Sequence, residues 1–224
     1  MRRFGRYLPL CALALACAPF ANAQAGFDVG MGFGGSMAPA AKTGIDTNLN
    51  NCILGTLGCQ PTPDLNSFMM GFRFDLMAWD KFGIGAQYNF EPTRTDYVTF
   101  PSANNFSYAL QSRVAFYDFN GILSPIRTQK VAVKLSGGIG GAQIKFYESG
   151  SSTTGLTGTQ SYSQYFGSSN HFAAHAAAGI QIYPTGGNWF IRPEFDYHYV
   201  HNLHQFGSNN VLRYSVWVGY TLGR

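Results

Sequence analysis

The residues best suited to chemistry are five histidines in the second half of the chain. His171 and His175 lie four residues apart, and His198, His201 and His204 recur every three residues. Imidazole carries protons near neutral pH and is the commonest metal ligand in proteins. A spacing of three does not put side chains on one face of a strand, because successive strand side chains point to opposite sides. The spacing is therefore weak evidence for a metal site.

A hairpin centred near Gln205 would bring His198 opposite Arg213, with Asp196 one diagonal step away. His175 could approach from an earlier strand. Such a cluster could bind a metal ion or take part in acid–base catalysis. No Ser or Cys nucleophile lies beside it in a recognisable motif. We therefore expect His175 and His198 to be paired polar groups at the mouth of a lumen, with no metal, no catalytic residue and no cofactor.

Charged residues recur on one face of the alternating segments of the chain, opposite an apolar face. The charged face carries Asp28, Arg73, Asp75, Glu91, Arg113, Lys134, Arg192, Glu194, Asp196 and Arg213. The interior of an eight-stranded barrel is just wide enough for side chains, and charges buried there must be paired. The nearly balanced signs predict a salt-bridge network that fills the lumen, since a selective pore favours one sign and more strands.

The start of the chain has the features of a secretory signal peptide. A basic start (residues 2–6), an apolar run (7–20) and small residues (21–23) follow one another. The run is shorter than the roughly 20 residues of a spanning helix. We expect residues 1–23 to be removed, which leaves 24–224 as one domain. The leader carries three arginines, so the excess of basic over acidic residues falls from four to one, and nucleic-acid binding loses its main support.

Two of the four cysteines, Cys11 and Cys17, leave with the leader. The mature chain keeps Cys52 and Cys59, in a segment rich in Gly, Asn and Pro. In an exported protein this arrangement predicts one small-loop disulfide, because a metal site or redox motif requires closer spacing or more ligands.

Eight segments alternate apolar and polar side chains with the period of a strand. They cover residues 27–33, 68–76, 82–91, 106–116, 131–141, 171–182, 189–199 and 211–222. In the last segment, Tyr214, Val216 and Val218 lie on one side, and Arg213 and Ser215 lie on the other. An apolar row opposite a polar row is what a strand between lipid and a polar lumen requires.

The alternation assigns a face to each residue of these segments. In 106–116 it places Val114 and Phe116 outward and Arg113 inward. In 131–141, the pairs Gly137-Gly138 and Gly140-Gly141 blur the alternation. We expect a β-bulge at these pairs, since glycine inside a strand often marks one.

The connections mostly alternate between long and short. We expect long loops at 35–66, 92–105, 148–170 and 201–210, and short turns at 78–81, 120–125 and 184–188. Outer-membrane barrels have long external loops and short periplasmic turns, so both termini are expected in the periplasm. The aromatic girdle of the periplasmic side would contain Trp79, Phe82, Trp189 and Tyr220, and that of the outer side Tyr88, Phe90, Phe106, Tyr108, Tyr197 and Tyr199.

The final strand, the alternation and the loop asymmetry resemble the small bacterial outer-membrane barrels, the family of OmpA-like and OmpX-like proteins. The chain ends Leu222-Gly223-Arg224, whereas that family usually ends on an aromatic residue. The resemblance implies an all-β, eight-stranded antiparallel up-and-down transmembrane β-barrel. It also implies a monomer in a Gram-negative-type outer membrane, with outer-membrane lipids, lipopolysaccharide and the barrel assembly machinery as partners.

Three classes of function are compatible with such a barrel. The first is a non-enzymatic envelope protein whose lumen is mostly filled and whose external loops contact surface ligands. The alternative is a narrow porin-like channel or a carrier of a small ligand. A lipid enzyme or a soluble lipocalin-like barrel is the third, but a lipocalin would require apolar residues inside and polar residues outside. The sequence favours the first class and names no ligand or solute.

Overall fold

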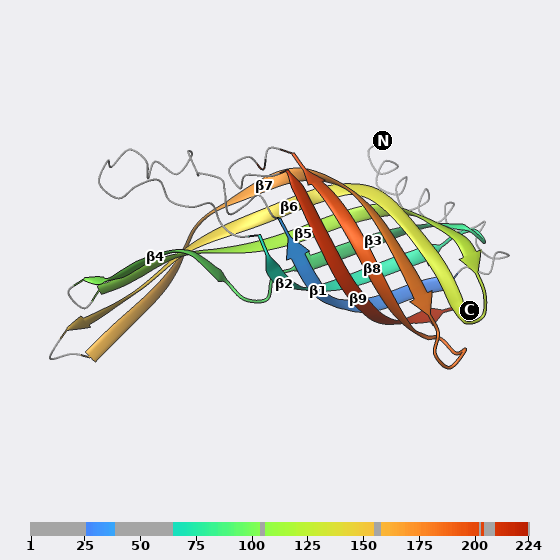
Figure 1. The fold of residues 1–224 in the computed structure, drawn as a ribbon, viewed down its shortest axis with the longest axis horizontal. Helices are drawn as coiled ribbons and strands as arrows, with labels where there is room; N and C mark the ends of the chain where they lie inside the picture. The colour runs from blue at the N-terminus through green and yellow to red at the C-terminus, as the bar shows by residue number, and fades with distance from the viewer. Residues whose placement is uncertain are drawn as a thin grey trace, which may run out of the picture.

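The computed structural model describes residues 26–38, 65–103, 106–154, 158–201, 203 and 209–223, which form an all-β structure (Figure 1). Its strands are β1 (Gly26–Met37), β2 (Ser67–Met77), β3 (Phe82–Phe90), β4 (Thr95–Ala103), β5 (Phe106–Arg127), β6 (Val131–Thr154), β7 (Gly158–Ile182), β8 (Trp189–Val200) and β9 (Asn210–Leu222). Among these residues, no helix is long and apolar enough to cross a membrane. The expected signal peptide and the Cys52–Cys59 pair lie outside the described residues and stay predictions.

Eight of the nine strands close into a ring. β1 pairs with β2 on one side and with β9 on the other, and β3 pairs with β5. Every pairing in the ring is antiparallel. β4 lies outside the ring, at the edge of β5. The predicted eight-stranded antiparallel barrel is confirmed.

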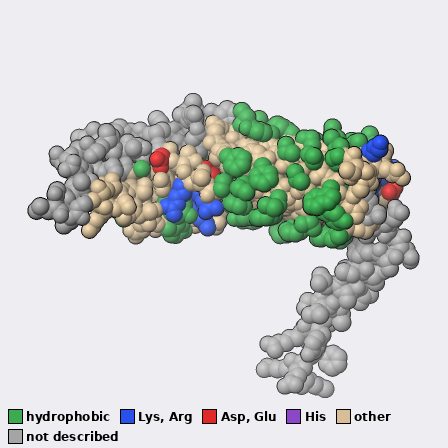
Figure 2. Space-filling view, turned by 90° about the horizontal axis from the view of Figure 1, so that it is seen from below, with side chains coloured by type: hydrophobic (Ala, Val, Ile, Leu, Met, Phe, Trp, Pro, Cys, Tyr) green, Lys and Arg blue, Asp and Glu red, His purple; other side chains and the backbone are tan. Residues whose placement is uncertain are grey.

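Side chains alternate between the lumen and the outer surface. In β8, every second residue from Phe190 to Val200 is buried, and the residues between them are exposed. The exposed residues of the ring are mostly large and apolar, and Figure 2 shows them as a broad band on the barrel. The buried set includes arginines, aspartates and histidines. Charges inside and apolar residues outside reverse the pattern of a soluble barrel and match that of a barrel that spans a membrane.

Aromatic residues mark both ends of the apolar band. The rings of Trp189 and Tyr220 meet edge to face at 5.3 Å. Trp79 and Phe82 flank the short turn between β2 and β3 and are exposed. These four residues lie at the end of the barrel that carries the short turns, as expected for a girdle. Of the residues expected at the other end, Tyr88, Tyr197 and Tyr199 are exposed and Phe90 is half-buried. The side chains of Phe106 and Tyr108 lie outside the described part.

The predicted face of the segment 106–116 is wrong for residues 109–116, whose side chains the structure describes. Val114 and Phe116 are buried in the lumen, 4% and 2% exposed, whereas Arg113 points to the outer surface. Both faces of this segment carry apolar residues, so its own alternation does not decide between them. The face is set further along β5, where Asp118 and Asn120 are buried and Tyr117 and Phe119 are exposed.

Three expected loops and turns contain strand. The expected turn at 120–125 lies within β5, and the chain instead turns at 128–130, where the Val131 amide donates to the Thr128 hydroxyl at 3.0 Å. Most of the expected loop 148–170 belongs to β6 and β7, and the expected loop 92–105 contains β4. Polar residues can pair along a strand that faces water on both sides, so a polar composition alone did not reveal these strands.

The added strands form a sheet beyond the barrel. The pairing of β7 with β8 begins only at Ala173, while β7 continues to pair with β6 as far as Gly158. We use the name extension for β4 together with residues 106–112, 146–154 and 158–170. In Figure 1 the extension projects from the end of the barrel opposite to the end of β9.

The β-bulge expected at the glycine pairs of β6 is absent from the described ladders. Gly138 pairs with Asn120 and Gly140 pairs with Asp118 in one unbroken register. A Cβ atom at Gly140 would come within 2.8 Å of the Asp118 Cα atom. The glycines therefore permit close approach of two backbones, and the register shifts lie elsewhere, between Leu123 and Ile126 and between Phe146 and Tyr147.

Candidate functional site in the lumen

Two arginines and two carboxylates form a closed ring of alternating charge across the lumen. Arg73 Nε donates to Asp75 Oδ1 at 3.1 Å, and Arg192 Nη1 donates to Asp75 Oδ2 at 2.9 Å. Glu194 completes the ring, because it accepts from Arg73 Nη1 and lies 3.6 Å from Arg192 Nε. The four side chains are at most 2% exposed. We call these residues the charge ring; it joins β2 to β8, which are separated by β1 and β9.

A second polar group lies below the charge ring, toward the short turns. Lys134 Nζ is 3.5 Å from Asp28 Oδ2, and Gln181 Nε2 donates to the same oxygen at 3.2 Å. Thr221 donates its hydroxyl to Asp28 Oδ1 at 2.6 Å. The Trp217 indole is fully buried nearby and lies against the Arg73 guanidinium, 5.3 Å from its ring centroid. Gly32 makes room for this indole, since a Cβ atom there would come within 2.6 Å of it.

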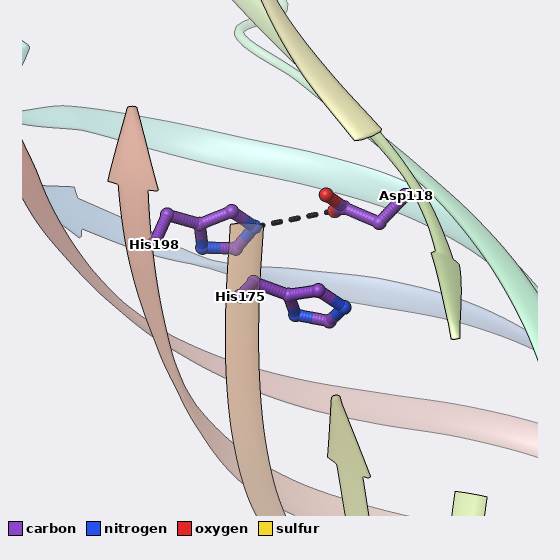
Figure 3. Close-up of side chains that lie close together, drawn as sticks. All are labelled: Asp118, His175 and His198. Atoms are coloured by element: carbon purple, nitrogen blue, oxygen red, sulfur yellow. Dashed lines mark hydrogen bonds and ion pairs between the residues drawn. The ribbon is translucent and has the colours of Figure 1, made fainter. Parts of the chain in front are cut away.

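Two histidines and an aspartate meet above the charge ring (Figure 3). The rings of His175 and His198 stack at 5.0 Å between centroids, with an interplanar angle of 22°. His198 Nε2 lies 3.2 Å from Asp118 Oδ2, and His175 Nε2 lies 2.5 Å from Asn120 Oδ1. Gln87 Nε2 also donates to Asp118 Oδ2, at 3.1 Å. We call Asp118, His175 and His198 the histidine cluster.

Arg213 and Asp196 lie beside the histidine cluster. Arg213 Nη2 donates to Asp196 Oδ2 at 3.4 Å. Asp196 Oδ1 in turn lies 3.9 Å from His175 Nδ1. The Arg213 guanidinium also lies over the Phe116 ring, 5.5 Å from its centroid. Asp196 of β8 and Arg213 therefore extend the polar contacts of the cluster to β9.

An apolar layer covers the histidine cluster on the side of the extension. Its buried members lie on six strands, β2 and β5 to β9, and in the segments next to β1, β2 and β8: Ala38, Leu65, Met69, Val114, Phe116, Ala142, Ile144, Ala173, Val200, Leu203 and Val211. Each is at most 4% exposed. Phe116 joins the two layers, because its ring lies 5.1 Å from that of His198.

The structure places most of the predicted lumen residues inside the barrel. Eight of the ten charged residues belong to the groups just described, all except Glu91 and Arg113. Glu91 is buried near the extension, where it accepts from the Val114 amide at 3.1 Å and from the Thr95 hydroxyl. Arg113 lies on the outer surface, where its Nε donates to the Glu91 carbonyl oxygen at 2.5 Å.

The predicted position and partner of the histidines need correction. His175 and His198 lie beneath the apolar layer, rather than at an open mouth. The predicted pairing of His198 with Arg213 is wrong by two residues, since His198 lies opposite Val211 and Arg213 lies opposite Asp196. Sequence reasoning missed Asp118 and Asn120, because it ended the strand at residue 116. Their alternation with Tyr117 and Phe119 is the signal that could have found them.

Two cations lie side by side on the outer surface, next to the apolar band. Arg113 of β5 is directly opposite Lys145 of β6. With Tyr88 and Phe90 they line a hollow of about 90 Å³. Figure 2 shows Lys and Arg side chains gathered where the band ends. We call Arg113 and Lys145 the rim pair.

Comparisons with known proteins are limited to fold. No protein-family model and no curated protein matches the chain. The solved structures that resemble it include a major outer membrane protein of Thermus thermophilus, with a TM-score of 0.49 and 12% identity over 88% of this chain and 99% of that one. Ail, the attachment invasion locus protein of Yersinia pestis, in complex with the heparin analogue sucrose octasulfate, gives 0.45 and 14% over 88% and 97%.

Neisserial surface protein A gives a TM-score of 0.43 and 11% identity over 90% of this chain and 98% of that one. The eight-stranded antiparallel fold that the family resemblance implies does not depend on these likenesses. The eight-stranded ring itself is established by the strand pairing of the present chain.

The charge ring generates a prediction about stability. Arg73→Met should lower the free energy of unfolding by about 3–5 kcal/mol, because it leaves two buried carboxylates to share Arg192 and so leaves one negative charge uncompensated. Adding Glu194→Met should recover part of this loss, since the second change removes the carboxylate itself. Chemical denaturation of the refolded barrel in detergent micelles measures both effects, with Lys81→Met on an exposed turn as control. If the separate losses of Arg73→Met and of Glu194→Met alone add up to the loss of the double variant within about 0.5 kcal/mol, the two residues do not act as a unit.

Proposed function

We propose that the chain is a non-enzymatic, monomeric protein of the outer membrane that has a closed lumen and displays the extension outside the cell. The apolar band supports insertion into a bilayer. The end of β9 and the extension lie at opposite ends of the barrel, which supports periplasmic termini and an external extension. The observation that carries the proposal is the extension, because a barrel that only filled a membrane would need no strands beyond it.

The layers of side chains in the lumen support its closure. The charge ring crosses the interior, the histidine cluster lies above it, and the apolar layer lies above both. A water-filled pore requires a continuous polar path, and an apolar layer of fully buried side chains interrupts one. This favours a filled lumen over the narrow channel or small-ligand carrier.

The closed lumen is tested in a planar bilayer. The refolded mature protein is expected to show no stable conductance steps, because no water-filled path crosses the apolar layer. Heat-modifiable migration in detergent should show in parallel that the inserted protein is folded. Stable steps whose size changes with Arg192→Gln or Glu194→Gln would show that ions pass through the lumen, and a channel function would replace the closed lumen.

The surface of the extension is suited to contact with other molecules. Tyr162, Tyr165 and Phe166 are 41%, 52% and 44% exposed, among serines, glutamines and glycines. Arg94 stacks on Tyr147, with its guanidinium 3.8 Å from the ring centroid. Aromatic residues supply rigid contact area at low entropic cost, and small polar residues supply adaptable hydrogen bonds, as in antibody paratopes. We therefore assign surface contact to this sheet.

Attachment assays test this role. Tyr162→Ser, Tyr165→Ser and Phe166→Ser together should reduce attachment of bacteria that express the protein to glycan-coated or matrix-coated glass about tenfold, because aromatic residues dominate contact energies. Gln160→Ser with Gln164→Ser on the same hairpin is the matched control. Protease treatment of intact cells checks that both variants are displayed. Equal attachment by displayed wild type and triple variant would remove the contact role of these residues.

The rim pair supports binding of an anionic lipid headgroup. Like charges directly opposite on neighbouring strands repel each other, and an anion between them relieves the repulsion. Arg113 and Lys145 lie beside the apolar band, at the level where the phosphate groups of outer-leaflet lipopolysaccharide would lie. Arginine and lysine are both established phosphate-binding residues.

Vesicles with and without lipopolysaccharide test the rim pair. Arg113→Gln with Lys145→Gln should weaken the lipopolysaccharide-dependent stabilisation of the barrel by about 2 kcal/mol, because each cation near an anionic membrane surface contributes about 1 kcal/mol. The control is Lys81→Gln with Lys130→Gln, which removes two cations from the opposite end. A rim variant that responds to lipopolysaccharide as strongly as the control contradicts the assignment.

A further inference from the structure

The histidine cluster has the composition and convergence of a metal site. Asp118 of β5, His175 of β7 and His198 of β8 each offer a ligand atom, and these atoms lie within 4.8 Å of one another. The three side chains are buried and come from three strands (Figure 3). Two imidazoles with one carboxylate are a common ligand set for zinc and related divalent ions. The cluster is therefore more specific than a group of acidic residues.

The hydrogen bonds of His175 leave one ring nitrogen free to act as a ligand. An amide oxygen only accepts hydrogen bonds, so the contact of His175 Nε2 with Asn120 Oδ1 places the proton on Nε2. Nδ1 then carries a lone pair. It lies 3.9 Å from Asp196 Oδ1, and neither atom has a hydrogen-bond partner among the described residues. Two buried acceptors that face each other favour a cation between them.

The charges around the cluster also favour a cation. The charge ring is neutral, and Asp28 is paired with Lys134. Among the described residues around the cluster, Asp118 and Asp196 then face Arg213 alone, if both imidazoles are neutral, and the buried Glu91 lies nearer the extension. Asp118 Oδ1 and His198 Nδ1 are further buried atoms without a hydrogen-bond partner in the described structure. Several unsatisfied buried atoms therefore lie where the negative charge lies, although Arg192 and Trp217 also carry buried atoms without a hydrogen-bond partner in the described structure.

We propose that Asp118, His175 and His198 bind one divalent transition-metal ion of the zinc type, with Asp196 in reach as a fourth ligand. Ligand atoms around tetrahedral zinc lie about 3.4 Å apart, so small side-chain rotations must bring these atoms closer together. The ion would replace the contact between His198 and Asp118. Gln87 and Asn120 already hold Asp118 and His175 from outside, and metal ligands are commonly oriented by such hydrogen bonds.

The surrounding layers determine when the ion can enter. The apolar layer closes the cluster on one side and the charge ring closes it on the other. The ion must therefore be taken up before the barrel closes. Once bound, it would connect β5 with β7 and β8 and stabilise the folded state, since metal binding that accompanies folding contributes to stability.

Refolding the protein with zinc or with a chelator tests the proposal. After removal of free metal, barrels refolded with Zn²⁺ should retain about one ion per folded chain by elemental analysis and should unfold at a higher denaturant concentration than barrels refolded with chelator. Refolding with Co²⁺ should give the visible absorption bands of a tetrahedral site. His175→Gln with His198→Gln should abolish retention, whereas the control His171→Gln, which removes an imidazole outside the cluster, should keep it.

Two results would overturn the proposal. One is folded wild-type protein that retains no stoichiometric zinc and shows no cobalt bands, whatever the double variant does. The other is retention that is equal in wild type and folded double variant, which would place the ion elsewhere. The wild-type measurement decides on its own, so the test remains valid if the double variant fails to fold. In that case Asp118→Asn takes the place of the double variant.

Discussion

The central constraint on this protein is the small interior of an eight-stranded barrel. Eight strands enclose a space that side chains fill, so a charge that points inward must find its partner there. The charge ring meets this constraint with two cations and two anions, each in contact with both ions of opposite sign. Its residues come from β2 and β8, on either side of the β1–β9 pairing that closes the barrel. The correct closure therefore brings the charges together, and the paired charges in turn favour that closure.

Strand length connects the barrel to the extension. A strand crosses a bilayer with roughly 9–11 residues, whereas β6 has 24 and β7 has 25. More than half of each strand is thus available outside the band. The same backbone ladder continues from the lumen into the extension, with one register shift between Phe146 and Tyr147. The extension is consequently a continuation of the barrel wall, which would present its aromatic residues on a firm support.

The sequence predicts the fold well because alternation is a local signal. Trp189 to Tyr199 show it without interruption, and the structure follows it residue by residue. The signal fails where both rows are apolar, as around Val114, and where both rows meet water, as from residue 159 to 170. The site is harder to predict, since the pairing of His198 depends on a loop length within 201–209 that alternation does not determine. Contacts across the lumen, such as Arg73 with Glu194, follow only from the closed ring.

The charge ring and the histidine cluster show two different outcomes of burial in one lumen. Asp75 receives hydrogen bonds at both carboxylate oxygens, from two arginines. Asp118, one layer higher, has one oxygen with two contacts and one with no hydrogen-bond partner in the described structure. Leaving a buried polar atom unsatisfied costs about 1–3 kcal/mol of stability. Apolar residues could fill the layer of the histidine cluster, as they fill the apolar layer above it. Buried polar atoms without a hydrogen-bond partner also occur elsewhere in the described lumen, as on Arg192 and Trp217. Around the two stacked histidines, however, such atoms lie on several neighbouring ligand-type side chains, which is what a binding site requires.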